Sequence, residues 1–491
     1  VQRAGLTQNP LENAKLQFRV LAVPLSTLVF RTLASTTLSR AKQRKCKNFF
    51  ALGLVFWLYQ RPMETTKKWI ESKFKHQEDI LQGNLLALEA GYRYAENSEM
   101  LEEQPNIAKA SLPQGTYRQI TGNEALALGA LLAQQQTGRS LLVAGYPITP
   151  ASDILQWFAQ HGIKTFQAED EIAAIGAALG ASFGGSLALT TTSGPGMDLK
   201  SEMLGLAVMV ELPLVVIDVQ RAGPSTGMPT KVEQSDLWMA LYGRHGECPV
   251  PVIAASTPAD CFHTILEVFK IAVTYMTPVI LLSDAYLANG AQPWLIPNLE
   301  ELPKIATSII PRITDFKPYK RNDNLARSWT TPGMEGYEHR IGGLEKTDIT
   351  GEISYDPVNH EKMVLLRKQK IENIAQNYSP TTIMGALEGS CLVIGWGSTY
   401  GFILTAIQEL QESNVSVSYV HLRHLYPLPL DLKPILSRFE KILVIEMNSG
   451  QLRSILRAAY LLDIKGLNKI KGQPFTVTEI KQGILALLGD V

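Results

Sequence analysis

The sequence contains few cysteines, and their spacing excludes several kinds of site. Only four occur among 491 residues, far apart and without a Cys-x-x-Cys pair: Cys46, Cys248, Cys261 and Cys391. This usage argues against a zinc ribbon or a locally encoded iron–sulfur cluster. A reducing cytoplasm fits it best, so we expect a cytoplasmic protein.

Long apolar runs and an excess of charge of one sign are also missing. The most apolar stretch, residues 49–59, is about half the roughly 20 residues that a membrane helix needs, so we interpret it as a buried helix. The 46 basic and 46 acidic residues cancel, which gives no general indication of nucleic acid or an anionic membrane as a partner. The chain begins at Val1 with no secretory signal and no recognisable start of a domain, so we expect part of its amino terminus to be missing.

The chain is long enough for about three domains. Residues 1–115 are expected to be mainly helical, with a long periodic segment over residues 70–94. We interpret the basic run at residues 42–47 as a solvated helix end rather than a binding patch. Residues 110–122 contain proline and glycine and predict a linker.

From residue 140 onward, short apolar runs alternate with longer helical patterns. This alternation is typical of an α/β fold with a doubly wound parallel sheet. The strands are expected at residues 141–144, 165–167, 187–191, 214–219, 252–254 and 279–282. A second, smaller α/β unit is expected to have strands at residues 392–395, 416–420 and 442–445, with helices after Tyr400 and Gln451. Residues 295–380 show no such alternation and predict a long crossing segment between the two units.

The loop after the first expected strand has an unusual composition. Residues 145–150 read Gly-Tyr-Pro-Ile-Thr-Pro, and the two prolines leave Thr149 little conformational freedom. Ligands of parallel sheets bind beyond the carboxyl ends of the strands. We therefore interpret this loop as part of a site rather than as a connection.

Two later loops follow strands in the same way. Gly194 and Gly196 permit close backbone approach, and a helix starting near Gly196 would direct free amide groups at an anion or a polar ring; a tight turn is an equally good interpretation. Arg221 can hold a carboxylate through two parallel N–H donors, and its place among glycines and prolines favours this over a surface salt bridge. Thr230 offers a hydroxyl that would help to select the acid.

An acidic triplet at residues 169–171 opens a helical run. Complementing the helix dipole explains Glu169 and Asp170. Glu171 abuts an apolar helix face, so we expect its carboxylate to be desolvated, with a raised proton affinity that suits acid and base chemistry. A Gly-x-Gly at residues 395–397 is only a weak dinucleotide signal, and we favour packing as its role.

Together these motifs resemble the α subunit of 2-oxoacid:ferredoxin oxidoreductases, most closely the 2-oxoglutarate type in which a γ domain is fused ahead of α. The resemblance is carried by Gly-Tyr-Pro-Ile-Thr-Pro-Ala-Ser-Asp at 145–153, Gln-Ala-Glu-Asp-Glu at 167–171, Thr-Ser-Gly-Pro-Gly at 192–196, Gly-Pro-Ser-Thr-Gly-Met-Pro-Thr at 223–230, Glu-His-Arg-Ile-Gly-Gly-Leu-Glu-Lys at 338–346 and Ser-Tyr-Asp-Pro-Val-Asn-His at 354–360. It implies a truncated γ domain with linker at 1–115, a pyrimidine-type thiamine diphosphate domain at 116–300, a crossing segment at 301–380 and a transketolase C-terminal-like domain at 381–491. We expect the front of the γ domain to be missing from this sequence, so no contribution of that part to coenzyme A use is assigned.

The resemblance also implies partners and cofactors. Thiamine diphosphate would be shared with a separate β subunit, which would supply the diphosphate site, Mg2+ and a [4Fe-4S] cluster. The complex would convert 2-oxoglutarate and coenzyme A to succinyl-CoA and pass electrons to ferredoxin. Pyruvate and branched-chain 2-oxoacids remain alternative substrates. A transketolase-like or lipoamide-linked decarboxylase half, or a truncated non-catalytic subunit, are alternative functions.

The resemblance assigns roles to individual residues. Glu171 would hydrogen-bond the aminopyrimidine ring of the cofactor, Thr149 would lie beside the reacting centre, and Arg221 would pair with a substrate carboxylate. The implied cofactor-binding residues are Pro147, Ile148, Thr149, Glu171, Ser193 and Gly194, and the implied substrate-binding residues are Arg221, Thr230 and Tyr146. The family usually has glycine where this chain has Ala222, a change that would tighten the loop if that position needs a positive φ.

Overall fold

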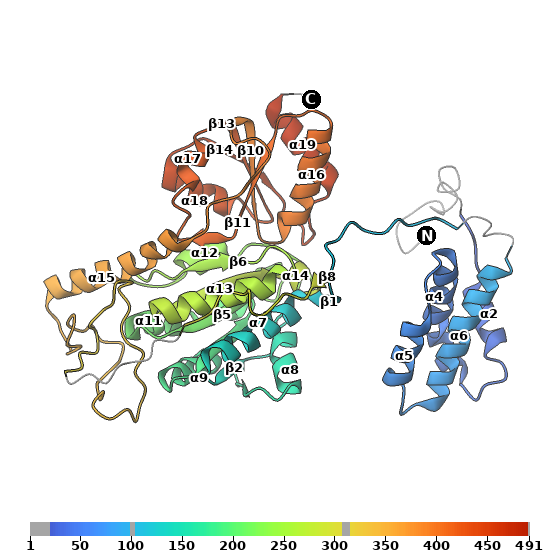
Figure 1. The fold of residues 1–491 in the computed structure, drawn as a ribbon, viewed down its shortest axis with the longest axis horizontal. Coiled ribbons are helices and arrows are strands. Elements are labelled where there is room, and N and C mark those ends of the chain that lie inside the picture. The colour runs from blue at the N-terminus through green and yellow to red at the C-terminus, as the bar shows by residue number, and fades with distance from the viewer. Residues whose placement is uncertain (1–19, 99–103, 307–314, 490–491) are drawn as a thin grey trace. The chain divides into compact units, whose positions relative to one another are not determined.

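A computed structural model of the chain describes residues 20–98, 104–306 and 315–489. The chain forms two compact units, Val1–Gln114 and Gly115–Val491, which are described separately below (Figure 1). None of the helices in the described ranges is long and apolar enough to cross a membrane.

The first unit is helical, as expected. Its helices are α2 (Leu25–Thr32), α3 (Arg40–Lys45), α4 (Lys47–Leu58), α5 (Glu64–Lys73) and α6 (Glu78–Glu96). Two glycines let α4 and α6 pack closely, because a Cβ atom at Gly53 would clash with the carbonyl oxygen of Leu88 and one at Gly91 with that of Phe50. The side chains of Lys42, Arg44 and Lys45 in α3 are exposed, which agrees with a solvated helix.

The structure adds detail to one expectation for this unit and corrects another. The periodic segment at residues 70–94 is two helices, because the chain turns at residues 74–77 so that Ile70 in α5 and Leu81 and Leu88 in α6 pack into one cluster. The apolar helix α4 is only partly buried: Phe50 and Gly53 are enclosed, whereas Val55 is 41% exposed. Most of the other residues of α4 are half-buried.

The second unit is built around a seven-stranded sheet with the strand order β12-β6-β7-β5-β4-β2-β3. Its strands are β2 (Leu141–Gly145), β3 (Thr165–Gln167), β4 (Leu187–Thr192), β5 (Leu214–Gln220), β6 (Val252–Ala254), β7 (Pro278–Asp284) and β12 (His424–Tyr426). All pairs are parallel except β12 with β6. The chain runs from β2 outward to β3 and then returns to β4 on the other side of β2, so the sheet is doubly wound and its topological switch point lies between β2 and β4. The predicted fold class and six of these strands are thus confirmed.

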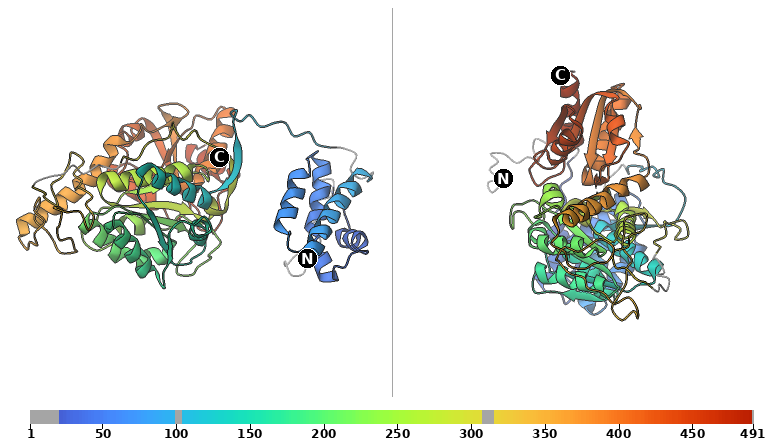
Figure 2. Two further views of the ribbon diagram at one scale, coloured as in Figure 1. Left: turned by 60° about the horizontal axis from the view of Figure 1, so that its bottom comes forward. Right: turned by 90° about the vertical axis from the view of Figure 1, so that its left-hand side faces the viewer.

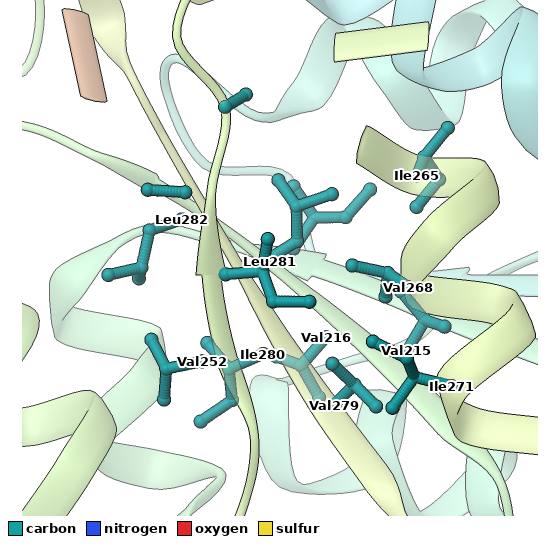
Figure 3. Packing of buried hydrophobic residues seen from close by; sticks show 14 of the residues in the cluster. Val215, Val216, Val252, Ile265, Val268, Ile271, Val279, Ile280, Leu281 and Leu282 are labelled. Atoms are coloured by element: carbon teal, nitrogen blue, oxygen red, sulfur yellow. The ribbon is translucent and has the colours of Figure 1, made fainter. Parts of the chain in front are cut away.

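Helices cover this sheet and enclose an apolar core. They are α7 (Gly122–Thr137), α8 (Ser152–Gln160), α9 (Glu171–Phe183), α10 (Gly194–Leu199), α11 (Ser201–Val210), α12 (Leu237–Tyr242), α13 (Asp260–Tyr275) and α14 (Ala285–Asn289). Helix α9 packs on β2 and β4, and α13 packs on β5 and β7. Figure 3 shows the second contact, where Ile265 and Val268 of α13 meet the buried side chains of the strands. Burial of both sheet faces explains why these strands are runs of branched apolar residues.

A two-stranded ribbon was not anticipated from the sequence. Strand β1 (Tyr117–Thr121) pairs antiparallel with β8 (Ala291–Leu295), which brings together the segments that precede β2 and follow β7. Strand β1 falls within the expected linker. Its partner lies about 170 residues away in sequence, and such a long-range pairing leaves no local pattern.

The crossing segment contains a helix that the sequence analysis missed. Helix α15 (Pro357–Glu372) begins with Asp356, whose carboxylate accepts a hydrogen bond from the backbone of Asn359 at 2.7 Å, and with a proline in its first turn. This Asp-Pro start is a recognised helix signal that was overlooked. The other described residues of the segment up to Asp356 contain no regular helix or strand, as expected, and residues 307–314 lie outside the described ranges.

The C-terminal region forms a second, five-stranded sheet with the order β14-β13-β10-β11-β9 (Figure 2). Its strands are β9 (Ile383–Met384), β10 (Gly389–Trp396), β11 (Ser418–Leu422), β13 (Phe439–Glu446) and β14 (Ile464–Asn468), and its helices are α16 (Tyr400–Glu412), α17 (Leu432–Leu436), α18 (Gln451–Tyr460) and α19 (Val477–Leu488). The three expected strands are present, with the second shifted by two residues. Strand β12 leaves this region and completes the edge of the large sheet.

The Gly-x-Gly motif at residues 395–397 lies where the C-terminal sheet contacts the loop that follows β5. Gly397 has a φ of 59°, and a Cβ atom there would clash with the side-chain amide of Gln234. Gln234 donates to the carbonyl oxygen of Trp396 at 2.8 Å, and its own Oε1 accepts from the backbone of Met447 at 2.9 Å. This geometry supports the interpretation that the motif serves packing.

Candidate active site

The unusual loops all leave the same edge of the large sheet. Strands β2, β4 and β5 are neighbours, so the loops that follow Gly145, Thr192 and Gln220 start side by side. The first two flank the topological switch point between β2 and β4. At such a point the neighbouring loops diverge and leave a crevice in which α/β proteins bind ligands.

Two side chains anchor the loop after β2. Arg221, from the loop after β5, donates through Nη1 to the carbonyl oxygen of Thr149 at 2.7 Å. Asn123, at the start of α7, donates to the carbonyl oxygen of Pro150 at 2.9 Å. The Thr149–Pro150 peptide bond is cis. The side chain of Arg221 is buried, so it ties two of the three loops together inside the protein.

The side chain of Glu171 packs against Gly196 in the loop after β4. It is the first residue of α9, its side chain is buried, and Asp170 caps the helix by accepting from the backbone of Ala173 at 2.7 Å. A Cβ atom at Gly196 would lie 2.7 Å from Cγ and 2.8 Å from Oε1 of Glu171. Only glycine therefore leaves room for the carboxylate at this position.

The same loop forms the first turn of α10. This helix starts at Gly194, two residues earlier than expected, because Ser193 takes an extended conformation and Pro195 occupies the first turn. Ser193 is fully buried, and its Oγ has no hydrogen-bond partner among the described residues. A buried hydroxyl without a partner is costly, so this group is available to a ligand.

A pair of buried carboxyl groups behind the loop was missed by the sequence analysis. Asp218 lies in β5 and is fully buried, and Asp236 precedes α12. Burial, and then the charge of Asp198, raise the pKa of Asp236 to about 7, while burial and Asp236 raise the pKa of Asp218 well above its usual range. The pair therefore retains a proton at neutral pH. The feature of the sequence that could have indicated this pair is Asp218 itself, an aspartate inside the apolar run of β5.

Asp236 links the second and third loops. A Cβ atom at Gly194 would lie 3.0 Å from each carboxylate oxygen of Asp236, so this side chain packs against the turn. The backbone N–H of Asp236 donates to Oε1 of Gln220 at 3.2 Å, and Gln220 donates to the carbonyl oxygen of Ser283 at 3.1 Å. The three loops are thus held by side chains on their inner side.

The remaining predicted site residues lie at the rim. Tyr146, Pro147, Thr149 and Thr230 are exposed and Ile148 is half-buried. Thr230 is not joined to Arg221 by any hydrogen bond within the described ranges. Ala222 does not take a positive φ, so the departure from the family's glycine does not strain the loop; Ser225 and Gly227 take the positive values instead.

Comparison with known proteins agrees with this geometry. Residues 137–355 match the family described as pyruvate flavodoxin/ferredoxin oxidoreductase, thiamine diP-bdg. The chain is 47% identical to the 2-oxoglutarate oxidoreductase subunit KorA of Mycobacterium tuberculosis, over 99% of this chain and 75% of that subunit. It is 32% identical to the 2-oxoglutarate synthase subunit KorA of Methanothermobacter marburgensis, over 75% of this chain and 98% of that subunit.

A solved structure is also similar. The 2-oxoglutarate:ferredoxin oxidoreductase from Magnetococcus marinus, with 2-oxoglutarate, coenzyme A and succinyl-CoA bound, superposes with a TM-score of 0.83 at 33% identity, over 94% of this chain and 80% of that chain. The chain belongs to the α subunits of the 2-oxoacid:ferredoxin oxidoreductases. The sequence motifs therefore identified the family, and the matched thiamine diphosphate-binding region contains all three loops of the site.

The residues of this 2-oxoacid:ferredoxin oxidoreductase subunit fit the pyrimidine half of thiamine diphosphate. The carboxylate of Glu171 offers a hydrogen-bond acceptor, and the buried hydroxyl of Ser193 offers a group with no other partner among the described residues. Gly194 and Gly196 carry no side chains, so the backbone at these two positions is open to close approach. Within the described residues, no cluster of three or more metal-ligating side chains occurs.

Proposed function

We propose that the chain is the α subunit of a 2-oxoglutarate:ferredoxin oxidoreductase, which converts 2-oxoglutarate and coenzyme A to succinyl-CoA and CO2. Two electrons per turnover pass to ferredoxin. Two contacts at the switch point of the sheet carry the proposal. Arg221 from the loop after β5 bonds to Thr149 in the loop after β2, and Glu171 at the start of α9 lies against Gly196 in the loop after β4. The names of the two KorA relatives, and the ligands of the Magnetococcus enzyme, support 2-oxoglutarate as the substrate.

Glu171 is proposed to hold the cofactor's aminopyrimidine ring in its reactive form. When bound, thiamine diphosphate supplies the electron sink for loss of CO2. Glu171 would accept a hydrogen bond from the pyrimidine ring, and Ser193 and Gly194 would line the same ring, together with Pro147, Ile148 and Thr149 from the loop after β2. Burial of the Glu171 side chain excludes water from this bond.

Arg221 is proposed to bind a carboxylate of the substrate. One of its N–H groups is occupied by Thr149, but its Nε is buried and has no hydrogen-bond partner in the described part of the chain. An incoming carboxylate would satisfy this donor and pair with the positive charge. Thr230 and Tyr146, which lie at the exposed rim, would contact the far end of the acid.

A β subunit is proposed to cover the site. Five large apolar side chains around the strand ends are between 39% and 51% exposed: Tyr146, Phe166, Ile172, Leu199 and Met228. Such a concentration of exposed apolar side chains next to a site is typical of an interface. The β subunit would bring the diphosphate site, Mg2+ and the [4Fe-4S] cluster, and the complex would act in the cytoplasm.

The domain boundaries given by the resemblance are kept as proposals. Residues 1–115 would be the remainder of a γ domain, residues 116–300 the pyrimidine-type domain, residues 301–380 the crossing segment and residues 381–491 the transketolase C-terminal-like domain. The split of the chain into compact units after Gln114 supports the first boundary.

A panel of 2-oxoacids tests the substrate proposal. The chain is co-expressed with its β partner, and reduction of a viologen dye is measured with coenzyme A and 2-oxoglutarate, pyruvate or a branched-chain 2-oxoacid. We expect kcat/KM for 2-oxoglutarate to exceed that for pyruvate at least ~10-fold, because a site that binds a second carboxylate is left with unpaired polar groups by pyruvate. Equal or higher values for pyruvate would contradict the assignment.

The role of Glu171 is tested in the same complex. Glu171→Gln keeps the shape of the side chain but removes the carboxylate, so we expect kcat to fall ~10²-fold or more. Glu169→Gln is the matched control, because Glu169 lies two residues away on the surface and should leave kcat unchanged. Activity of the Glu171→Gln complex within a few fold of the wild type would remove Glu171 from this role.

A further inference from the structure

A buried lysine contacts the backbone of the residue that carries the proposed catalytic carboxylate. Lys200 follows α10 and is fully buried. Its Nζ donates to the backbone carbonyl oxygen of Glu171 at 2.9 Å. The side chain of Glu171 lies across Gly196 in the same short helix. Glu171 is therefore held from two sides by one segment, through its side chain at Gly196 and through its backbone at Lys200.

The position of this ammonium group is energetically unfavourable. Burial withdraws it from water and lowers the pKa of Lys200 to about 8, although the charges of Glu171 and Asp170 partly oppose the shift. The amino-terminal end of α9 carries a partial positive charge, which repels a cation placed beneath it. The charged form of Lys200 is therefore held in a buried position against the cost of its desolvation.

We propose that Lys200 is a positioning residue, whose ammonium group fixes the first turn of α9 so that the carboxylate of Glu171 meets the cofactor at the correct distance. The inference rests on the proposed function of Glu171. It adds a residue that touches neither substrate nor cofactor and acts through Glu171. The hydrogen bond from Lys200 to the backbone of Glu171 fixes the position of the first turn of α9. The space left by the missing side chain of Gly196 fixes the direction of the Glu171 side chain.

The charged groups around Lys200 determine how pH affects its hydrogen bond to Glu171. Glu171 and Asp170, at the start of α9, are the charged groups that act on the ammonium from the facing element. Asp198 and Glu202 flank Lys200 along its own segment, and Asp198 is exposed. When the pH rises through about 8, Lys200 loses its charge and its bond to Glu171 weakens.

Exchange of the cofactor's C2 proton is the first measurement, because it needs no 2-oxoacid, coenzyme A or ferredoxin. The αβ complex is loaded with thiamine diphosphate and Mg2+, placed in D2O, quenched with acid and analysed by NMR between pH 6 and pH 9.5. We expect Lys200→Met to slow exchange about 10-fold at pH 7, since a small displacement of a catalytic group has an effect of this order. The ratio of the wild-type exchange rate to that of Lys200→Met should become smaller above pH 8.

Thermal unfolding of the same variant separates positioning from mere support of the fold. Because the folded-state pKa of Lys200 is lowered, its cost to stability is present below pH 8 and is relieved as the pH rises toward the unfolded value. Lys200→Met should therefore melt at the same or a higher temperature than the wild type at pH 7, with a difference that narrows above pH 8. A melting temperature well below the wild type would show a structural role and overturn the proposal.

A matched lysine serves as the control. Lys346 is also buried, donates to the carbonyl oxygens of Gly342 and Leu344 at 2.7 Å, and has a pKa that burial lowers to about 8. It belongs to the crossing segment and takes no part in the proposed site. Lys346→Met should exchange the cofactor proton at the wild-type rate, with the same dependence on pH.

Glu171→Gln in the same assay distinguishes the two proposals. If Glu171→Gln exchanges as fast as the wild type, the proposed function of Glu171 fails. If Glu171→Gln is slow while Lys200→Met matches the wild type at every pH, Glu171 keeps its role and the inference about Lys200 is overturned. Slow exchange in both variants, with the pH dependence lost in Lys200→Met, is the expected result.

Discussion

Gly196 shows how a single missing side chain shapes the site. Thr192 and Glu171 both occupy the space in which a Cβ atom would stand. The φ of Gly196 is not positive, so glycine is required there for room rather than for backbone conformation. The glycine motif after β4 thus indicates that other side chains lie close against the backbone there.

Gly196→Ala should reduce activity more than stability. The added methyl group would force the Glu171 carboxylate away from its position, and we expect kcat of the αβ complex to fall ~10²-fold. The control is Gly180→Ala in the same helix as Glu171, because a Cβ atom at Gly180 meets nothing within 4 Å. That variant should be fully active and slightly more stable, because alanine is the better helix former. Equal activity of the two variants would contradict the steric argument.

A buried glutamate forms ion pairs that join the crossing segment to the large sheet domain. Glu211 follows α11 and accepts from Arg321 through both oxygens and from Lys370 of α15, each at 2.6 Å. Burial by itself would raise the pKa of Glu211, but Lys370 and Arg321 outweigh it and lower the pKa to about 2. This stabilisation is complete above the unfolded-state value of about 4.3 and is lost as the pH falls toward 2.

Glu211→Gln should destabilise the protein strongly. It leaves two buried cations without their counter-charge, which costs about 3–5 kcal/mol of unfolding free energy. Urea denaturation followed by tryptophan fluorescence at pH 7 measures the decrease in the free energy of unfolding. Glu409→Gln is the control, since its partner Lys481 is partly exposed at 2.8 Å and such pairs contribute less than about 1 kcal/mol. A loss below 1 kcal/mol for Glu211→Gln would show that the segment is held elsewhere.

In the second unit as a whole, the two sheets depend on each other. Strand β12 belongs in sequence to the C-terminal region but pairs with β6 at the edge of the large sheet. Gln234 and Gln451 join the loop after Thr230 to the C-terminal region, since Gln451 donates to the carbonyl oxygen of Ser235 at 2.8 Å. The far end of the loop that carries Arg221 is thus fixed by the other sheet.

Removal of the C-terminal region should therefore disrupt the site domain. A fragment of residues 115–380 would expose the edge of β6 and lose the partners of Gln234, so we expect it to aggregate. A fragment of residues 115–491 keeps both sheets and should stay monodisperse with one cooperative melting transition. Size-exclusion chromatography and calorimetry compare the two. A monomeric, cooperatively melting fragment of residues 115–380 would contradict this dependence.

Much of the fold followed from local pattern. Strand β6 has the bounds that its apolar run predicted, because a strand buried on both faces leaves an uninterrupted apolar signal. Strand β3 also has the predicted bounds, although it lies at the edge of the sheet and its residues are exposed or half-buried. Strands β1, β8 and β12 were missed because each pairs with a strand far away in sequence. Strands β9 and β14 of the C-terminal sheet were not expected either. Helix α15 was missed although its Asp-Pro start was visible.

The sequence alone determined the doubly wound fold and the three loops. It also singled out Thr149 and Arg221 in two of these loops and Glu171 at the start of a neighbouring helix as chemically distinctive. These follow from motifs of adjacent residues, in which glycine and proline fix the backbone and one polar group remains. The tertiary structure decided that Arg221 binds the backbone of Thr149, that Asp218 and Asp236 retain a proton, and that Lys200 supports Glu171. Contacts between distant segments, and the desolvation that sets proton affinity, depend on how the whole chain packs, and no local pattern records them.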